Sequence, residues 1–227
     1  MGDRDRQGFI IKTYSLIVIM LVFTTVWCFL SFNNVEYIKF FMSNIWLYWL
    51  SFIIVIGISV GMACHYRKFQ RAPLNYILLS TYTVAHAYLI SVIIQFYKVD
   101  TIIQAAAATA GMFVVLTGYA CWTKGDMTKK GGLICTICEC IFWLIIFQFI
   151  WGPVTRFMYM VICFAIICLL GVFIVHDTQM IVGGKNRKFQ LDHNDYVIGA
   201  IIIYSDIVTA FIYILSLFGG GNWRMKV

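Results

Sequence analysis

Seven runs of about twenty apolar residues, joined by short polar connections, constrain this sequence more than any other feature. A helix needs roughly 20 such residues to cross the hydrocarbon core of a bilayer. We therefore predict an all-α integral membrane protein, a seven-helix bundle in a single transmembrane domain (14–218) between a short cytosolic N-terminus (1–13) and a short C-terminal tail (219–227). The predicted spans cover residues 14–32, 46–64, 75–96, 101–122, 131–151, 154–175 and 196–218.

The composition excludes a soluble domain. Of the 227 residues, 62% are hydrophobic and 12% are charged, whereas a soluble domain is roughly half apolar and a quarter charged. The net charge of +7 does not indicate a nucleic-acid binder, because the basic residues lie in short gaps between apolar runs and not on one solvated face. The partner that the composition predicts is the lipid bilayer.

The basic residues predict how the helices are oriented. They concentrate in the N-terminal segment and in the second, fourth and sixth connections, which contain Arg67, Lys129 and Lys188 respectively. An excess of Lys and Arg marks the cytosolic side of a membrane protein. We therefore expect the N-terminus and these three connections to face the cytosol. Basic residues in the C-terminal tail leave open whether the last helix crosses fully or turns back.

Three acidic residues lie within or beside the predicted spans. An ionised carboxylate at the bilayer centre costs roughly 2.5 to 3.5 kcal/mol, so such acids usually face a protein interior or a water-filled path. Asp206 lies deepest, roughly 16 Å along the last span. Asp177 lies at the cytosolic end of the sixth span, where an ordinary interfacial acid is the alternative. Glu139, in the first half of the fifth span, is a secondary candidate that a hydrogen bond within the bundle would also explain.

Other polar side chains have simpler explanations. His86, in the third span, is interpreted as a neutral imidazole bonded to a backbone carbonyl, with a proton relay as the alternative. Cys135, Cys138 and Cys140 have a metal-like spacing but lie in an apolar run, so we interpret them as packing residues. We expect no bound cofactor.

Two enzyme classes share features with this sequence. The segment Gly57-Ile58-Ser59-Val60-Gly61 has the pattern of a nucleophile elbow, but that motif needs a strand-turn-helix setting and here lies in an apolar span. An intramembrane aspartyl protease also uses two aspartates on neighbouring helices, yet its Gly-x-Gly-Asp and Pro-Ala-Leu motifs are missing from the sequence. We therefore predict that the protein is not an enzyme.

Several motifs occur in a fixed order along the chain. The earlier ones are Pro73-Leu74-Asn75-Tyr76, Gln104-Ala105-Ala106 and Thr123-Lys124-Gly125-Asp126-Met127-Thr128. The most specific lie in the last third: His176-Asp177-Thr178-Gln179, Gly183-Gly184, Asp195-Tyr196 and Tyr204-Ser205-Asp206-Ile207-Val208. In order and spacing these motifs resemble the signature of the Bax-inhibitor (transmembrane Bax inhibitor motif) family, Lifeguard branch.

The resemblance implies a fold and a function. The implied fold has two three-helix layers around a central C-terminal helix, and the implied function is a pH-sensitive calcium leak in the endoplasmic reticulum or Golgi that lowers store calcium and restrains apoptosis. Its pH sensor, a pair of aspartates on the sixth and seventh helices, falls on Asp177 and Asp206. His86 replaces a common third-helix acid, and His176 replaces a common Tyr or Ile, so the family's pH response does not transfer in detail.

The chemistry of two adjacent carboxyls supports this interpretation of the pair. Two carboxyls in a dry site do not both ionise cheaply, so Asp177 and Asp206 are expected to share a proton and titrate as a unit. Carboxylate oxygens are ligands that Ca²⁺ prefers, so the pair could also contact the permeant ion transiently. The spans leave the two residues one to two helical turns apart in depth, a gap that the sequence does not close.

Two expectations concern the partners of the pair. Arg67 or Lys68, at the cytosolic end of the second span, is a candidate latch that pairs with the aspartates when they ionise. The direction of the pH response is open. The alternative to a channel is a non-conducting scaffold that modulates apoptotic or calcium-channel membrane proteins.

Overall fold

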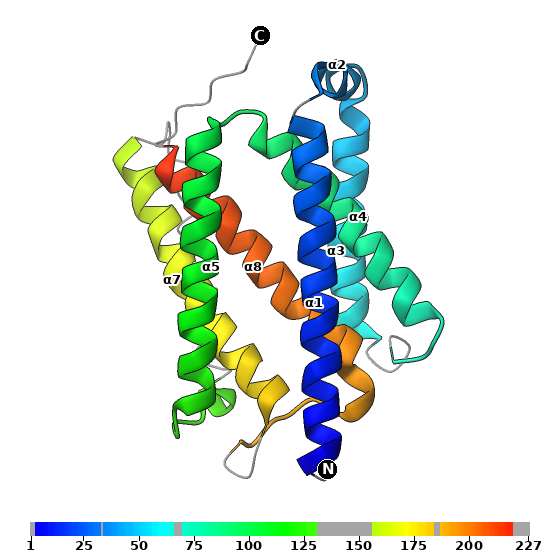
Figure 1. The fold of residues 1–227 in the computed structure, drawn as a ribbon, viewed down its shortest axis with the longest axis vertical. Helices are drawn as coiled ribbons and strands as arrows, with labels where there is room; N and C mark the ends of the chain where they lie inside the picture. Colours follow the sequence, from blue (N-terminus) through cyan, green and yellow to red (C-terminus); the bar gives the residue numbers. More distant parts are fainter. Residues whose placement is uncertain (1–2, 33, 66–69, 131–155, 184–186, 220–227) are drawn as a thin grey trace. The chain divides into compact units, whose positions relative to one another are not determined.

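The computed structural model describes residues 3–32, 34–65, 70–130, 156–183 and 187–219, and within these ranges the chain forms helices and no strand (Figure 1). The α-helices are α1 (Asp3–Phe32), α2 (Val35–Ser43), α3 (Ile45–Cys64), α4 (Leu74–Ile94), α5 (Val99–Trp122), α7 (Arg156–Val182) and α8 (Tyr196–Phe218). The short 3₁₀ helices are η2 (Met127–Lys130) and η3 (His193–Asp195).

Six of the helices in the described ranges are long and apolar enough to cross a membrane, namely all of the α-helices except α2. The prediction of an all-α integral membrane protein is therefore confirmed. The fifth predicted span, 131–151, lies outside the described residues.

Two helices extend beyond their apolar runs. α1 begins at Asp3, so most of the predicted N-terminal segment is helical and continuous with the first span. α7 continues to Val182, whereas the sequence prediction ended the sixth span at residue 175. The helix ends where Gly183 takes a φ of 64°, a left-handed conformation that glycine adopts without steric cost, and the Gly183 N–H donates to the Gln179 carbonyl at 2.9 Å. Asp177 therefore lies inside the helix and not at its end.

The helix α2 was missing from the sequence prediction. Asn34 caps its N-terminus, because the Asn34 side chain accepts a hydrogen bond from the Glu36 N–H at 2.9 Å. With nine residues, α2 is too short to cross a bilayer. It belongs to the connection between the first two spans.

The chain divides into two compact units. The first contains the described residues of Met1–Lys98 and Asp192–Tyr204, and in it α4 packs against both α1 and α3. In the 18-residue apolar stretch of α4, 61% of the residues are buried, against 6% in that of α3, because α4 packs against helices on two sides. The hydroxyls of Thr24 and Tyr204 lie 2.7 Å apart in its interior.

The second unit contains the described residues of Val99–Leu191 and Ser205–Trp223. Here α5 and η2 both pack against α7. Its apolar core is formed by Ile166 and Leu170 on α7 with Ala210 on α8, and Met112 on α5 packs against it. The unit therefore joins the helix that carries Asp177 to the part of α8 that carries Asp206.

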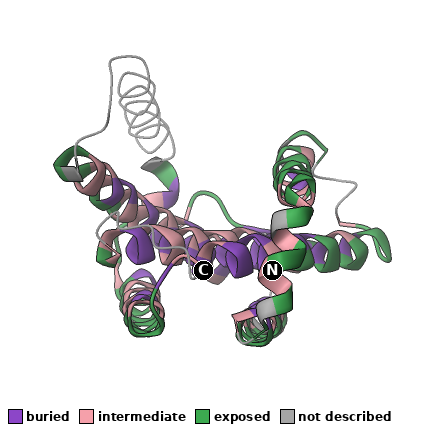
Figure 2. Cartoon of the chain, turned by 90° about the horizontal axis from the view of Figure 1, so that it is seen from above, coloured by how far each residue is buried: buried purple, intermediate pink, exposed green. Residues whose placement is uncertain are grey.

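Many large apolar side chains of the described residues are exposed, and Figure 2 marks the exposed positions along the helices in green. Ile53 on α3 is 64% exposed and Val115 on α5 is 69% exposed. Soluble monomers rarely expose contiguous apolar patches of this kind. The exposed apolar faces are consistent with helices that contact lipid.

Candidate functional site

Asp177 and Asp206 come together in the second unit. Asp177 on α7 is 7% exposed, and the carboxyl of Asp206 on α8 lies within hydrogen-bonding reach of it. The Asp206 Oδ2 atom is buried and has no donor among the described residues. A carboxylate has no proton to donate, so a hydrogen bond between these two groups requires one of them to be protonated. We call these two residues the carboxyl pair.

The connection between α7 and α8 explains how Asp177 and Asp206 come into contact, although the predicted spans placed them at different depths. Because α7 continues to Val182, Asp177 is preceded and followed by helical turns. The Leu191 N–H donates to the Met180 carbonyl at 3.1 Å, so the connection has folded back beside α7 before α8 starts. The connection therefore runs back along the end of α7, and α8 can bring Asp206 to the level of Asp177.

A third titratable side chain contacts the carboxyl pair. His176 Nδ1 lies 2.7 Å from Asp177 Oδ1, and the two side chains are 16% and 10% exposed. Neutral imidazole can donate to or accept from a carboxyl group, depending on its tautomer. His176 was only a secondary candidate in the sequence, and the structure places it in direct contact with the pair.

His86 lies in the first unit, in an aromatic setting. Its ring centroid is 4.6 Å from that of Tyr82 and 5.6 Å from that of Tyr204. The His86 Nε2 atom is buried and has no hydrogen-bond partner among the described residues. Aromatic packing surrounds this side chain, and the contacts of the described residues give no continuous relay through it.

Several predicted positions lie outside the described residues: the latch candidates Arg67 and Lys68, the acid Glu139, and Cys135, Cys138 and Cys140. Ser59 is described, and it lies within α3 with its hydroxyl donating to the Val55 carbonyl at 2.9 Å. This helical setting is not a nucleophile elbow. Across the described ranges, no three His, Cys, Asp or Glu side chains form a group that could hold a metal ion.

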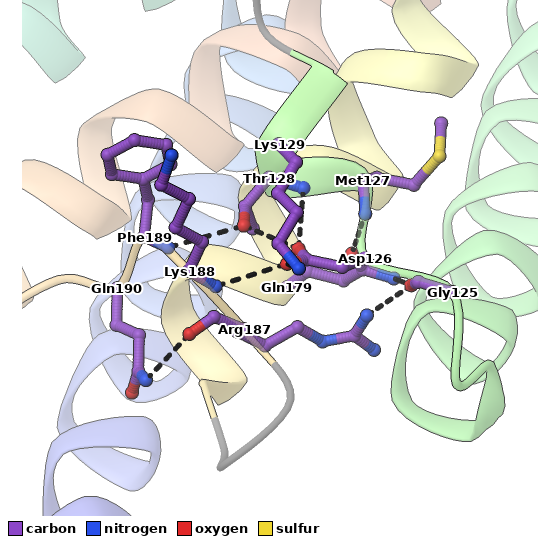
Figure 3. Close-up of polar contacts among 10 residues, drawn as sticks. All are labelled: Gly125, Asp126, Met127, Thr128, Lys129, Gln179, Arg187, Lys188, Phe189 and Gln190. Carbon is purple, nitrogen blue, oxygen red and sulfur yellow. Dashed lines mark hydrogen bonds and ion pairs between the residues drawn. The ribbon is translucent and has the colours of Figure 1, made fainter.

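In the same unit as the carboxyl pair, hydrogen bonds join the end of α7 to the connecting segment 123–130 and join that segment to a second one, 187–190 (Figure 3). We call this network the clasp. Its principal members are Gly125, Asp126, Gln179, Arg187 and Lys188. Asp126 and Gln179 lie in two of the sequence motifs, but neither residue was predicted to have a role.

Asp126 joins the two connecting segments. Its Oδ1 accepts from the Thr128 hydroxyl at 2.5 Å and from the Thr128 N–H at 3.0 Å, and its Oδ2 accepts from the Lys188 N–H at 3.1 Å. The Lys129 Nζ lies 3.4 Å from the same Oδ2. The hydrogen bond from the Thr128 hydroxyl, followed by those from Lys188 and Lys129, lowers the pKa of Asp126 below its ordinary value. The carboxylate thus stays ionised in mildly acidic solution.

Arg187 and Gln179 meet at one backbone carbonyl. The Arg187 guanidinium donates to the carbonyls of Gly125, Ala120 and Thr123, the last at 2.7 Å. Gln179 Nε2 donates to the same Gly125 carbonyl at 3.1 Å. The last carbonyls of a helix have no partner within the helix, and a cation there is also favoured by the helix dipole. Arg187 therefore supplies the positive charge that the last turn of α5 itself lacks.

The clasp predicts how stability depends on pH. Because the folded-state pKa of Asp126 is lowered, its ionised form contributes stability above the unfolded-state pKa, and that contribution is lost as pH falls through the folded value. We expect Asp126→Asn to lower the thermal midpoint in detergent at neutral pH. The difference from the unmodified protein should then close as the solution is acidified below the ordinary aspartate pKa of 3.8. A midpoint difference that is constant over this range would contradict the assignment.

Comparison with known proteins identifies relatives over nearly the whole chain. Residues 6–223 match the sequence profile of the family described as "Inhibitor of apoptosis-promoting Bax1". Human "Protein lifeguard 3" is 30% identical over 223 residues, which cover 96% of this chain and 70% of the relative, and its mouse counterpart is also 30% identical. The "Golgi anti-apoptotic protein" of vaccinia virus (strain Lister) is 26% identical over 96% of this chain and 87% of its own length.

Proposed function

Because the chain belongs to the Bax-inhibitor family, we propose that it restrains apoptosis from an intracellular membrane by conducting a pH-sensitive calcium leak. The family description and the name of the viral relative both support the anti-apoptotic part. That relative's name also supports a location in the Golgi. The alternation of basic residues supports a cytosolic N-terminus.

The contact between Asp177 and Asp206 carries the proposal of a leak. While the pair shares a proton, it holds α7 to α8 within the second unit. When the proton leaves, two like charges face each other in a site that excludes water, and they repel. Separation of the pair then exposes carboxylate oxygens to the ion path. We therefore expect the leak to grow as pH rises through the titration of the pair.

The ligand set of the site suits a passing ion better than a resident one. Ca²⁺ takes six to eight oxygen ligands, and the pair supplies only two carboxyl groups. Water and backbone carbonyls would complete the shell during passage. A site that binds an ion weakly releases it readily, which is what conduction requires.

His176 is the further titratable side chain that touches the carboxyl pair. Its Nδ1 lies 2.7 Å from Asp177 Oδ1, and the imidazole can donate to or accept from that carboxyl group, depending on its tautomer. The charged and titratable groups in contact with the pair, among the described residues, are thus His176 and the two aspartates themselves.

The test is calcium entry into liposomes that contain only the purified protein, measured with an entrapped indicator dye over about pH 5 to 8. We expect entry above that of protein-free liposomes, with a rate that rises with pH. Entry equal to the protein-free control at every pH would contradict the leak. That result would favour a non-conducting scaffold acting on apoptotic or calcium-channel membrane proteins.

A further inference from the structure

The end of α7 is held on two sides. Asp177 and Gln179 are two positions apart in the sequence, which places them about 200° apart around the helix axis. Asp177 contacts Asp206 on α8, while Gln179 contacts the backbone of the segment 123–130. A rotation of α7 that moves Asp177 away from Asp206 therefore moves Gln179 as well.

Gln179 makes a two-point connection to that segment, as Figure 3 shows. Its Oε1 accepts from the Met127 N–H at 2.9 Å, and its Nε2 donates to the Gly125 carbonyl at 3.1 Å. The side chain is 1% exposed, so water does not replace these bonds when they break. A buried polar group that loses its partners is costly, and the connection therefore resists rotation of α7.

The segment that Gln179 binds is itself anchored. The Gly125 carbonyl also accepts from Arg187, and the neighbouring Asp126 binds the Lys188 N–H. The charged groups around Gln179 are thus Asp126, Lys129, Arg187 and Lys188, and all belong to the clasp. Because Arg187 and Lys188 hold the segment 123–130 in place, the hydrogen bonds of the Gln179 amide to that segment also fix the rotation of α7.

We propose that Gln179 is a positioning residue for the carboxyl pair: by fixing the rotation of α7, it sets the pH at which Asp177 and Asp206 separate. The inference rests on the pair proposed above as the sensor of the calcium leak. It assigns to Gln179 a role that requires no contact with the ion. Loosening the connection should let the pair separate with less repulsion, at a lower pH.

The test uses Gln179→Leu, which keeps the size of the side chain and removes both hydrogen bonds. The matched control is Gln104→Leu, the same change at an exposed glutamine on α5 in the same unit. The carbonyl-stretch band of the protonated pair is followed by infrared spectroscopy against pH and is assigned by its loss in Asp206→Asn. The titration midpoint is the pH at which half of this band is lost. From the strength of a hydrogen bond, we expect the titration midpoint in Gln179→Leu to move by about half to one pH unit toward acid. Gln104→Leu should not move it.

A second variant keeps the test informative if Gln179→Leu folds poorly. Gln179→Met has a thioether in place of the amide, so it cannot donate to the Gly125 carbonyl and adds no charge near the pair. It should shift the midpoint in the same direction. An unchanged midpoint in both variants, or no titrating band in the unmodified protein, would overturn the proposal. A shifted band in protein that conducts no calcium would support the positioning role and refute the calcium leak.

Discussion

Replacement of Asp206 by Asn is expected to remove most of the pH dependence of the calcium leak while the helices stay folded. The substitution keeps nearly the same shape, and it removes the charge whose repulsion from Asp177 would separate the pair. An ionised carboxylate in the membrane is costly, so its loss does not destabilise the spans. In calcium-entry measurements, the ratio of the rates at the two ends of the pH range should fall toward one.

Two variants separate this effect from a general loss of acidic charge. Asp206→Glu retains a carboxyl group and should retain a pH response. Asp100→Asn removes an exposed acid from the first turn of α5, in the same unit, and should leave the profile unchanged. A well-folded Asp206→Asn protein with the pH profile of the unmodified chain would contradict the role of the pair, whichever direction the response takes.

Replacement of Arg187 by Met is expected to cause the largest loss of stability in the clasp. The change leaves the carbonyls of Ala120, Thr123 and Gly125 without the guanidinium, and among the described residues the Gly125 carbonyl retains Gln179 as a donor. Hydrogen bonds from a charged group contribute about 1.5 to 3 kcal/mol each and do not add fully, so we expect a loss of about 2 to 3 kcal/mol. The thermal midpoint in detergent should fall by roughly 5 to 10 °C.

Neighbouring substitutions distinguish geometry from charge. Lys188→Met removes a positive charge at the next position, but the Lys188 contact with Asp126 uses the backbone N–H, which the variant keeps. It should therefore be nearly neutral. Arg187→Lys keeps the charge but loses the planar guanidinium that reaches several carbonyls. Its thermal midpoint should therefore lie between those of Arg187→Met and Lys188→Met. Equal midpoints for Arg187→Met and Lys188→Met would show that the guanidinium does not cap α5.

Length and hydropathy alone were sufficient to predict the class of this protein. A run of about twenty apolar residues has few stable states other than a helix across a bilayer, so the described spans appear where the runs are. The same reasoning ended the sixth span too early, because Asp177 and Gln179 interrupt the apolar run. The signal for the true end was Gly183, a residue suited to the left-handed position that terminates a helix.

The aspartates themselves could be found from the sequence, because a carboxyl group within a span is costly enough to need a reason. The contact between them could not be predicted, because it depends on where the connection after α7 turns back. The hydrogen bond from the Leu191 N–H to the Met180 carbonyl shows the position of that turn. The clasp was also beyond prediction, because Arg187 binds backbone carbonyls, and backbone groups are the same at every position of the sequence. The length of an apolar run depends on one segment alone, so it can be determined from the sequence. The hydrogen bonds that orient α7 form only between segments that folding brings together.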